Sequence, residues 1–392
     1  MSVSTPPTLD PAGLASWREV SASALAHNVA TLRGLAGPAK LGVVVKADAY
    51  GHGLGPVCQG LVQAGVDWLI VNFAHEAVSV RALVGPALPI YVCGTVFPHD
   101  APALVDARAR VVLYDPLVAA ALADVSRARG VVTPVHLKVE TGTHRQGLTT
   151  ADAAALAARV HELGSLTLEG LTTHFADIED STDHRFAESQ LAALHEAQRA
   201  LAAQGLPVPM VHAANSAATI LDERTRGDLV RVGIAAYGLW PSKETLAAFR
   251  ERHGRTPPTL SPVLSWRARL AQVKDVPAGA YVGYGRTFRT TRPSRIGILP
   301  VGYHEGYDRR LSNAGHVLVR GQRAPVRGRV CMNMGMVDLT DVPGAAAGDV
   351  ATLLGSDGEE RISAEQLAAW MGTIHYEAVA RIHGGQPSLL AH

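Results

Sequence analysis

The chain has 392 residues, of which 47% are hydrophobic and 18% charged, and its 36 Lys and Arg nearly balance its 35 Asp and Glu. So much apolar sequence at so small a net charge excludes a disordered chain and disfavours a uniformly basic, polymer-binding protein. Three distant cysteines, with no C-x-x-C spacing, argue against a disulfide framework or a zinc ribbon.

The N-terminal segment, residues 1–13, has neither the basic stretch nor the apolar stretch of a signal peptide. No apolar run in the chain reaches the length that crosses a bilayer. We therefore expect a cytoplasmic protein without membrane association.

Eight short runs rich in β-branched residues follow from about residue 40, with Ala-rich stretches between them. Because the runs do not alternate polar and apolar residues, they indicate strands buried on both faces. The intervening sequence predicts helices, for example over 151–164 and 185–205. About eight βα units predict a (β/α)8 TIM-type barrel, and the absence of G-x-G-x-x-G after the first run disfavours a doubly wound sheet. The runs cover residues 41–46, 66–73, 88–94, 110–114, 133–140, 168–174, 208–214 and 228–234.

The residue pattern changes near residue 255, where helical periodicity stops and short strand-like runs alternate with Gly-rich turns. We predict a barrel domain with an N-terminal extension over residues 1–255 and a mostly β domain over 256–392. The second domain is expected to include a helix near its end, over 363–372, with Ser363 as N-cap and Gly372 as the stop.

A lysine, Lys46, closes the first apolar run. Desolvation at a buried strand end would lower the pKa of its amine and favour Schiff-base chemistry. From this segment alone, a lysine whose side chain extends to the surface is the commoner outcome.

The sequence around Lys46, KADAYGHG (46–53), resembles the lysine motif of alanine racemases, which bind pyridoxal 5'-phosphate (PLP). The resemblance implies a PLP-dependent isomerase that interconverts L- and D-alanine, supplies D-alanine for peptidoglycan, and works as a homodimer with shared active sites. The likeness continues in the family's order through residues 138–147, 173–177, 212–217, 231–238, 282–288, 299–313, 328–338 and 373–382.

Two residues carry the catalysis that the resemblance implies. Lys46 would hold PLP and act on one face of the substrate Cα, and Tyr284 of a second subunit would act on the other. Racemisation removes a proton from one face and returns it on the other, so two opposed groups suit it. A tyrosine of pKa ~10 needs a stabilised phenolate to act as a base, and the family pattern places His174 and Arg145 near it.

The resemblance also implies a cofactor pocket. Arg231 would donate to the pyridine nitrogen, and because arginine stays protonated the ring would remain a weak electron sink that favours fast reprotonation over transamination. His174 would stack on the ring. The remaining cofactor residues, which hold mainly the phosphate, would be Tyr50, Asn215, Ser216, Gly233, Ile234 and Tyr376.

The substrate carboxylate would be held by Arg145, as a charge-assisted donor, and by the backbone N–H of Met332, beside Tyr303. Lys138 matches a family lysine that is often carbamylated. The entry corridor that the resemblance implies consists of Asp180, Arg309, Arg329 and Asn333.

Departures from the family pattern bear on specificity. Asn333 stands where the family usually has Asp, Thr143 where Met is frequent, and His304-Glu305 where Ala-Asp is usual. The ending of the chain also differs, with HGGQP at 383–387. We expect alanine as the preferred substrate, with serine or another small amino acid as the alternative.

Three other functions were weighed. His-Glu pairs occur, but none has a second His four residues after the first, so we expect no metal site. Many arginines lie between 286 and 329, yet acidic residues interrupt them and no RNA-binding aromatic signature appears, so nucleic-acid binding is disfavoured. A barrel-type PLP decarboxylase would carry a Gly-rich phosphate loop and a Cys-Glu motif, and the sequence has neither.

Overall fold

A computed structural model describes residues 11–86, 88–254 and 256–391. The expectation of no signal peptide rests on residues 1–13, of which 1–10 lie outside the described residues. The chain divides into two compact units. The barrel unit comprises Ser23–Lys46 and Cys58–Ser261, and the β unit comprises Met1–Ala22, Ala47–Val57 and Pro262–His392.

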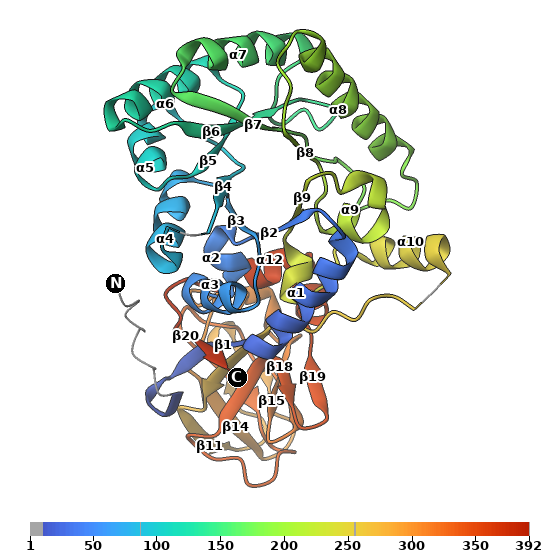
Figure 1. Ribbon diagram of the computed structural model, residues 1–392. Helices are drawn as coiled ribbons and strands as arrows, with labels where there is room; N and C mark the ends of the chain where they lie inside the picture. The colour runs from blue at the N-terminus through green and yellow to red at the C-terminus, as the bar shows by residue number, and fades with distance from the viewer. Residues whose placement is uncertain (1–10, 87, 255, 392) are drawn as a thin grey trace. The chain divides into compact units, whose positions relative to one another are not determined.

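The barrel unit is built on eight parallel strands in the order β8-β7-β6-β5-β4-β3-β2-β9 (Figure 1). Each predicted run overlaps one of these strands, so the predicted barrel is confirmed. The runs are mostly apolar because strands such as β3, β4, β8 and β9 are buried at every residue. The strands are β2 (Lys40–Val44), β3 (Trp68–Val71), β4 (Ile90–Val92), β5 (Arg110–Leu113), β6 (Thr133–Lys138), β7 (Leu166–Thr172), β8 (Met210–His212) and β9 (Leu229–Val232).

Strands β8 and β9 are joined by single hydrogen bonds instead of a ladder. The N–H of Asp228 donates to the Val211 carbonyl and that of Arg231 to the Ala214 carbonyl, each at 2.9 Å. Gly227 lies so near β8 that a Cβ there would come 2.3 Å from the Val211 carbonyl oxygen. The barrel is therefore nearly closed, and Arg231 is fixed at the seam.

Helices cover the outside of the ring of strands (Figure 1). The N-cap of helix α7 is Thr149, whose hydroxyl accepts a hydrogen bond from the N–H of Asp152. The helix is followed by Gly164 in the left-handed conformation. It and α8 confirm the helices predicted over 151–164 and 185–205. The helices are α1 (Ala22–Ala36), α3 (Leu54–Gln63), α4 (Ala74–Val84), α5 (Ala101–Asp106), α6 (Pro116–Arg129), α7 (Thr150–Leu163), α8 (Arg185–Ala203), α9 (Ser216–Leu221) and α10 (Lys243–His253).

The β unit contains three sheets. The largest runs β16-β15-β18-β10-β1-β20, with β19 paired to β18, and the others are β11-β14-β17 and β12-β13. Helix α11 (Ala364–Met371) begins at its N-cap Ser363 and ends at Gly372, as predicted, and α12 (His375–Ala380) follows. The strands are β10 (Leu264–Arg269), β11 (Gln272–Val276), β12 (Tyr281–Val282), β13 (Phe288–Arg289), β14 (Ser294–Leu299), β15 (His316–Val319), β16 (Gln322–Pro325), β17 (Gly335–Asp338), β18 (Val350–Asp357) and β19 (Glu360–Ile362).

Two strands of the largest sheet come from segments near the chain ends and were not predicted. Strand β1 (Ser16–Ser21) pairs antiparallel with β10 and parallel with β20 (Ser388–Ala391). The β unit therefore includes residues that precede the barrel in sequence. None of the described helices combines the length and apolarity of a membrane-spanning segment.

Candidate functional site

Predicted site residues of the barrel unit gather where the parallel strands end. Lys46 follows β2, Lys138 is the last residue of β6, His174 follows β7, and Arg231 lies in β9. Parallel strands direct their carboxyl ends to one face of a barrel, which is where barrel enzymes carry their active sites. The topology thus brings these four side chains to one end of the barrel.

The imidazole of His174 experiences a strongly positive environment. Burial is the main cause that lowers its pKa well below the ordinary value, and the charges of Arg231, Arg145, Lys138 and Lys46 add to it. Four cations acting on one imidazole leave His174 neutral at physiological pH. Such a site attracts an anionic group.

The amine of Lys138 is also perturbed. Burial, then the charges of Arg231 and Arg145, lower its pKa to about 8. Its Nζ donates to Oε1 of Gln146 at 3.2 Å. Roughly a tenth of this amine is therefore unprotonated at pH 7, far more than in an ordinary lysine of pKa about 10.4.

Arg231 is held rigidly. Its side chain is 8% exposed, and Nη1 donates to Nδ1 of His212 at 2.6 Å. Nη2 donates to the carbonyls of Thr173 (2.8 Å) and Ala213 (2.9 Å). These contacts orient a planar, permanently charged donor at the end of β9.

A hydroxyl and backbone amides meet beside Arg231. Oγ of Ser216 accepts from the N–H of Gly233 at 2.9 Å and of Ala235 at 3.4 Å. The neighbouring Asn215 caps α9 by accepting from Ala218 N–H at 2.9 Å, and Ile234 is buried. This cluster supplies the hydroxyl and N–H donors that phosphate oxygens bind.

The loop after β6 carries Arg145. The Glu140 carboxylate accepts from the N–H of Gly142 (2.6 Å) and of Arg145 (3.2 Å), and the Thr143 hydroxyl donates to the His174 carbonyl at 2.7 Å. The Arg145 side chain is itself exposed, as is that of Asp180.

In the β unit, the chain after Lys46 makes a left-handed helical turn. Ala47, Asp48, Ala49 and Tyr50 all have φ between 53° and 55°, a conformation that costs an L-residue about 1–2 kcal/mol. Such strain persists only where surrounding contacts hold it. The turn was not predicted from the sequence.

Arg18 supplies those contacts. Its guanidinium, 2% exposed, donates to Oδ2 of Asp48 (2.7 Å) and to the carbonyls of Gly51 (2.8 Å) and Gln386 (2.7 Å). Oδ1 of Asp48 accepts from Leu54 N–H at 2.8 Å. The ion pair between buried Arg18 and half-buried Asp48 thereby fixes the turn that carries Tyr50.

The ring of Tyr50 lies near that of Tyr376, with centroids 6.3 Å apart. Two predicted cofactor residues from distant parts of the sequence are thus brought together within the β unit. Tyr376 is the second residue of α12, which begins after the N-cap Ile374.

Tyr284 lies in the loop between β12 and β13 and is 72% exposed. Gly283 and Gly285, with φ of 76° and 70°, flank it. A Cβ at Gly285 would lie 3.0 Å from the guanidinium carbon of Arg329, so this loop and the predicted corridor residue are in close contact.

The loop that carries Met332 is pinned by backbone and side-chain hydrogen bonds. Tyr303 N–H donates to the Cys331 carbonyl at 3.0 Å, and Glu305 accepts from Gly302 N–H (2.8 Å) and from Nδ2 of Asn333 (2.7 Å). The side chains of Met332 and Tyr303 are 55% and 43% exposed. The predicted corridor residues Arg309, Arg329 and Asn333 are exposed as well.

The donor set fits PLP. In the barrel unit, cations converge on a neutral imidazole, and a hydroxyl with backbone N–H groups lies beside them, which matches a phosphorylated, anionic ring. Among the described residues, no cluster of His, Cys, Asp or Glu could hold a metal ion.

Sequence reasoning missed two polar systems, Arg18 with Asp48 and a buried chain of histidines that ends at Arg231. Arg18 gave no signal, because one arginine in a short segment before the barrel is unremarkable. The histidine chain did leave a signal, since His136 and Glu169 interrupt otherwise apolar runs.

Comparison with known proteins finds two family models that match successive parts of the chain. A family model described as "Alanine racemase, N-terminal domain" matches residues 20–241, and one described as "Alanine racemase, C-terminal domain" matches residues 263–389.

Single proteins are similar over nearly their whole length. An alanine racemase from Leptospira interrogans is 36% identical over 381 residues, which cover 96% of this chain and 95% of that protein. The solved alanine racemase from Streptomyces coelicolor superposes with a TM-score of 0.87 at 34% identity, over 97% of this chain and 99% of that one. A Bartonella henselae alanine racemase, solved with covalently bound pyridoxal phosphate, gives 0.80 at 26% identity, over 96% and 100%.

Proposed function

The chain belongs to the alanine racemase family, and on that premise we propose that it interconverts L- and D-alanine with PLP as cofactor. The observation that carries the proposal is the cationic end of the barrel, where Lys46, Lys138, Arg145 and Arg231 surround the neutral His174. This charge suits an anionic cofactor and a substrate carboxylate.

Bound PLP would withdraw electrons from the substrate and acidify its Cα–H bond. Lys46 would attach the cofactor, His174 would stack on its ring, and Arg231 would face the pyridine nitrogen. Because Arg231 donates hydrogen bonds and has no proton to release at physiological pH, it would leave the ring a weaker electron sink, which favours fast return of the proton to Cα over side reactions.

In the barrel unit, Ser216 and the N–H groups of Gly233 and Ile234, next to Asn215, would bind the phosphate. Tyr50 and Tyr376, whose rings lie near each other in the β unit, are the further cofactor residues that the family resemblance implies.

Two bases would exchange the proton, Lys46 on one face of Cα and Tyr284 on the other. The 72% exposure of Tyr284 supports a second proposal, a homodimer in which each β unit completes the partner's site. A phenol this exposed works as a selective base only when another surface excludes water from it.

Substrate binding would use Arg145 and the Met332 N–H for the carboxylate, with Tyr303 beside them. The lowered pKa of Lys138 supports its reaction with CO2, because carbamate formation needs an unprotonated amine. The carbamate would then offset part of the charge of Arg145. Asp180, Arg309, Arg329 and Asn333 would line the entry.

In the cell, the enzyme would act in the cytoplasm and supply D-alanine for peptidoglycan. The missing carboxylate at Asn333 favours one alternative, a racemase with broader specificity that includes serine.

Purified protein tested against a panel of L-amino acids, with and without added PLP, decides between these functions. We expect D-alanine from L-alanine as the fastest conversion, stimulated by PLP. Faster conversion of serine would establish the broader racemase, release of CO2 would establish a decarboxylase, and no D-amino acid from any substrate would refute the proposal.

A further inference from the structure

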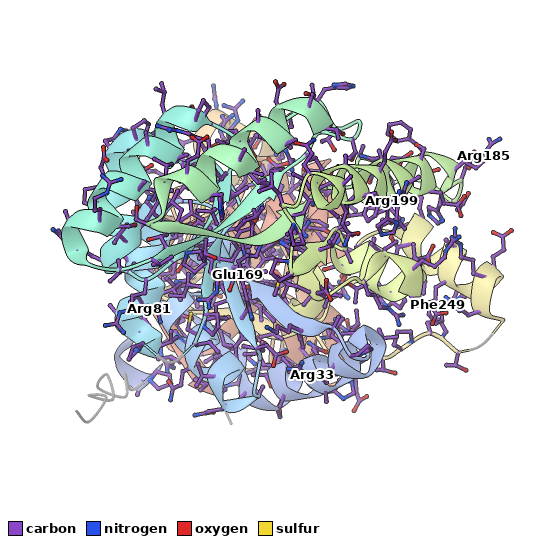
Figure 2. The ribbon with its side chains drawn as sticks, turned by 45° about the horizontal axis from the view of Figure 1, so that its top comes forward. Arg33, Arg81, Glu169, Arg185, Arg199 and Phe249 are labelled. Atoms are coloured by element: carbon purple, nitrogen blue, oxygen red, sulfur yellow. The ribbon has the colours of Figure 1, made fainter. Side chains whose placement is uncertain are left out.

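A line of polar side chains crosses the barrel unit, buried at its Arg231 end and half-buried at the other end. Figure 2 labels one of its members, Glu169, amid the barrel strands, whereas the labelled Arg185 lies on an outer helix. The line runs from β9 through β8, β6 and β7 to β5, and its members are Arg231, His212, His136, Glu169 and Arg110.

Each link is a direct contact. Nη1 of Arg231 lies 2.6 Å from Nδ1 of His212, Nε2 of His212 lies 2.8 Å from Nδ1 of His136, and Nε2 of His136 lies 2.9 Å from Oε2 of Glu169. Nε of Arg110 completes the line at 3.0 Å from Glu169. Both imidazoles are fully buried.

The barrel is shaped to admit this line. His136 pairs with Gly170 across β6 and β7, and a Cβ at Gly170 would come 2.2 Å from Nδ1 of His136. Tyr91 packs against both imidazoles, with ring centroids 4.7 and 5.5 Å away. Glycine is needed at position 170 because any side chain there would displace the His136 ring.

The hydrogen bonds can run in only one direction. Arginine has no acceptor, so Nδ1 of His212 must accept and its Nε2 must carry the proton. His136 then accepts at Nδ1 and donates from Nε2 to Glu169, which as a carboxylate only accepts. The line therefore has a fixed polarity, from the cation at β9 to the carboxylate at β7.

Both imidazoles remain neutral. Burial, then the charges of Arg231 and His136, lower the pKa of His212 well below its ordinary value. Burial likewise lowers the pKa of His136 although Glu169 opposes this. For Glu169, hydrogen bonds and charge from His136 and Arg110 outweigh burial and lower the pKa, so the line ends in a carboxylate.

We propose that Glu169, acting through His136 and His212, is a positioning residue that orients Arg231 and partly offsets its charge. Hydrogen bonds in series polarise one another, so the carboxylate makes His212 a better acceptor for the guanidinium. This inference rests on the proposed function, in which Arg231 faces the cofactor ring and sets how strongly it withdraws electrons.

The experiment compares Glu169→Gln with wild-type holoenzyme. Glutamine keeps the size and can still accept from His136, but it lacks the charge. We expect kcat to fall by about 2-fold to 30-fold, the range for residues that act through others, with KM nearly unchanged. The pH titration of the bound PLP absorbance should shift, and Glu169→Asp should recover part of that shift.

Arg110→Gln should shift the same measurements in the opposite direction. It leaves the Glu169 charge without its ion-pair partner, so it should move the PLP titration and the Arg231 guanidinium NMR signals opposite to Glu169→Gln. General loosening of the barrel would move both variants the same way, and that result overturns the proposal. Glu162→Gln, which breaks an exposed pair with Arg159 on α7, is the matched control.

The NMR readout separates this proposal from the proposed function. Guanidinium and imidazole N–H signals of 15N-labelled protein report the line whether or not the enzyme racemises alanine. If wild type shows no racemase activity, the proposed function fails while the signals still test the line. If the Arg231 signals and the PLP titration of Glu169→Gln are the same as those of Glu162→Gln, the proposed role of Glu169 is refuted.

Discussion

The barrel unit and the β unit present most of their proposed site residues differently, although Arg145 and Asp180 of the barrel are exposed as well. Arg231 and Lys138 of the barrel are 8% and 7% exposed, whereas Tyr284, Met332 and Tyr303 of the β unit are 72%, 55% and 43% exposed. The first set is already desolvated, so its charges act strongly. The second set is still solvated, so in this chain the proposed residues of the β unit act in water-like surroundings, unlike those buried in the barrel.

The largest expected effect tests the barrel unit. Lys46→Ala should remove the yellow colour of purified protein and lower the racemisation rate by at least ~10⁴-fold, because it deletes both the cofactor attachment and one base. Absorption spectra and D-alanine assays measure this. Lys40→Ala, an exposed lysine at the other end of β2, should keep colour and activity. An unchanged visible spectrum in Lys46→Ala would sink the assignment.

Tyr284→Phe tests the exposed half. Loss of one base should slow catalysis by about 10²-fold to 10⁴-fold, and more in one direction than the other. Deuterium incorporation from solvent into L- and D-alanine measures the asymmetry. Tyr281→Phe, 52% exposed on the same hairpin, serves as the control and should match wild type. Equal, near-wild-type exchange from both enantiomers would contradict a two-base role.

The two units also differ in what the sequence could predict. The eight barrel strands were all found, because burial on both faces leaves uninterrupted apolar runs such as 41–46. In the β unit, β1 pairs with β20 although the two segments are far apart in the sequence. Strands this short are not marked by a recognisable pattern of polar and apolar residues, so the sequence did not predict them. The left-handed turn at 47–50 was missed because its residues include no glycine.

The candidate site shows the same limit. Motif residues such as Lys46 and Tyr284 could be named from the sequence, since the resemblance is local to each motif. Their supports could not, because Arg18 and Asp48 meet only when distant segments fold together. Hydrogen-bond partners depend on three-dimensional proximity that spacing along the chain does not encode.

Arg18→Gln should destabilise the β unit while leaving the barrel's own contacts intact. It removes a buried cation from Asp48 and leaves the carbonyls of Gly51 and Gln386 unsatisfied, which costs about 2–3 kcal/mol. Urea unfolding followed by circular dichroism measures the loss. Arg127→Gln, from an exposed pair with Asp124, should cost less than about 1 kcal/mol. Equal losses in the two variants would show that Arg18 does not hold the turn.

Glu305→Gln tests whether the exposed Met332 loop is nonetheless rigid at its base. Burial opposes ionisation of Glu305, but hydrogen bonds from Gly302, Asn333 and His304 outweigh it and hold the pKa below its usual range. A carboxylate whose pKa is depressed in the folded state stabilises the protein at pH values above its unfolded pKa of about 4.3. That stabilisation is lost as the pH falls through the folded-state pKa.

At pH 7 the variant should therefore unfold about 1–2 kcal/mol more easily than wild type, and the difference should shrink below pH ~4.3. Urea midpoints across this range measure it, with Glu359→Gln, an exposed turn carboxylate, as a control that stays within about 0.5 kcal/mol. A difference that does not depend on pH would mean that shape, and not charge, makes Glu305 important. In that case packing, and not the Glu305 charge, would hold the Met332 loop in place. The barrel unit and the β unit would then differ in how exposed their site residues are, and not in the role of buried charges.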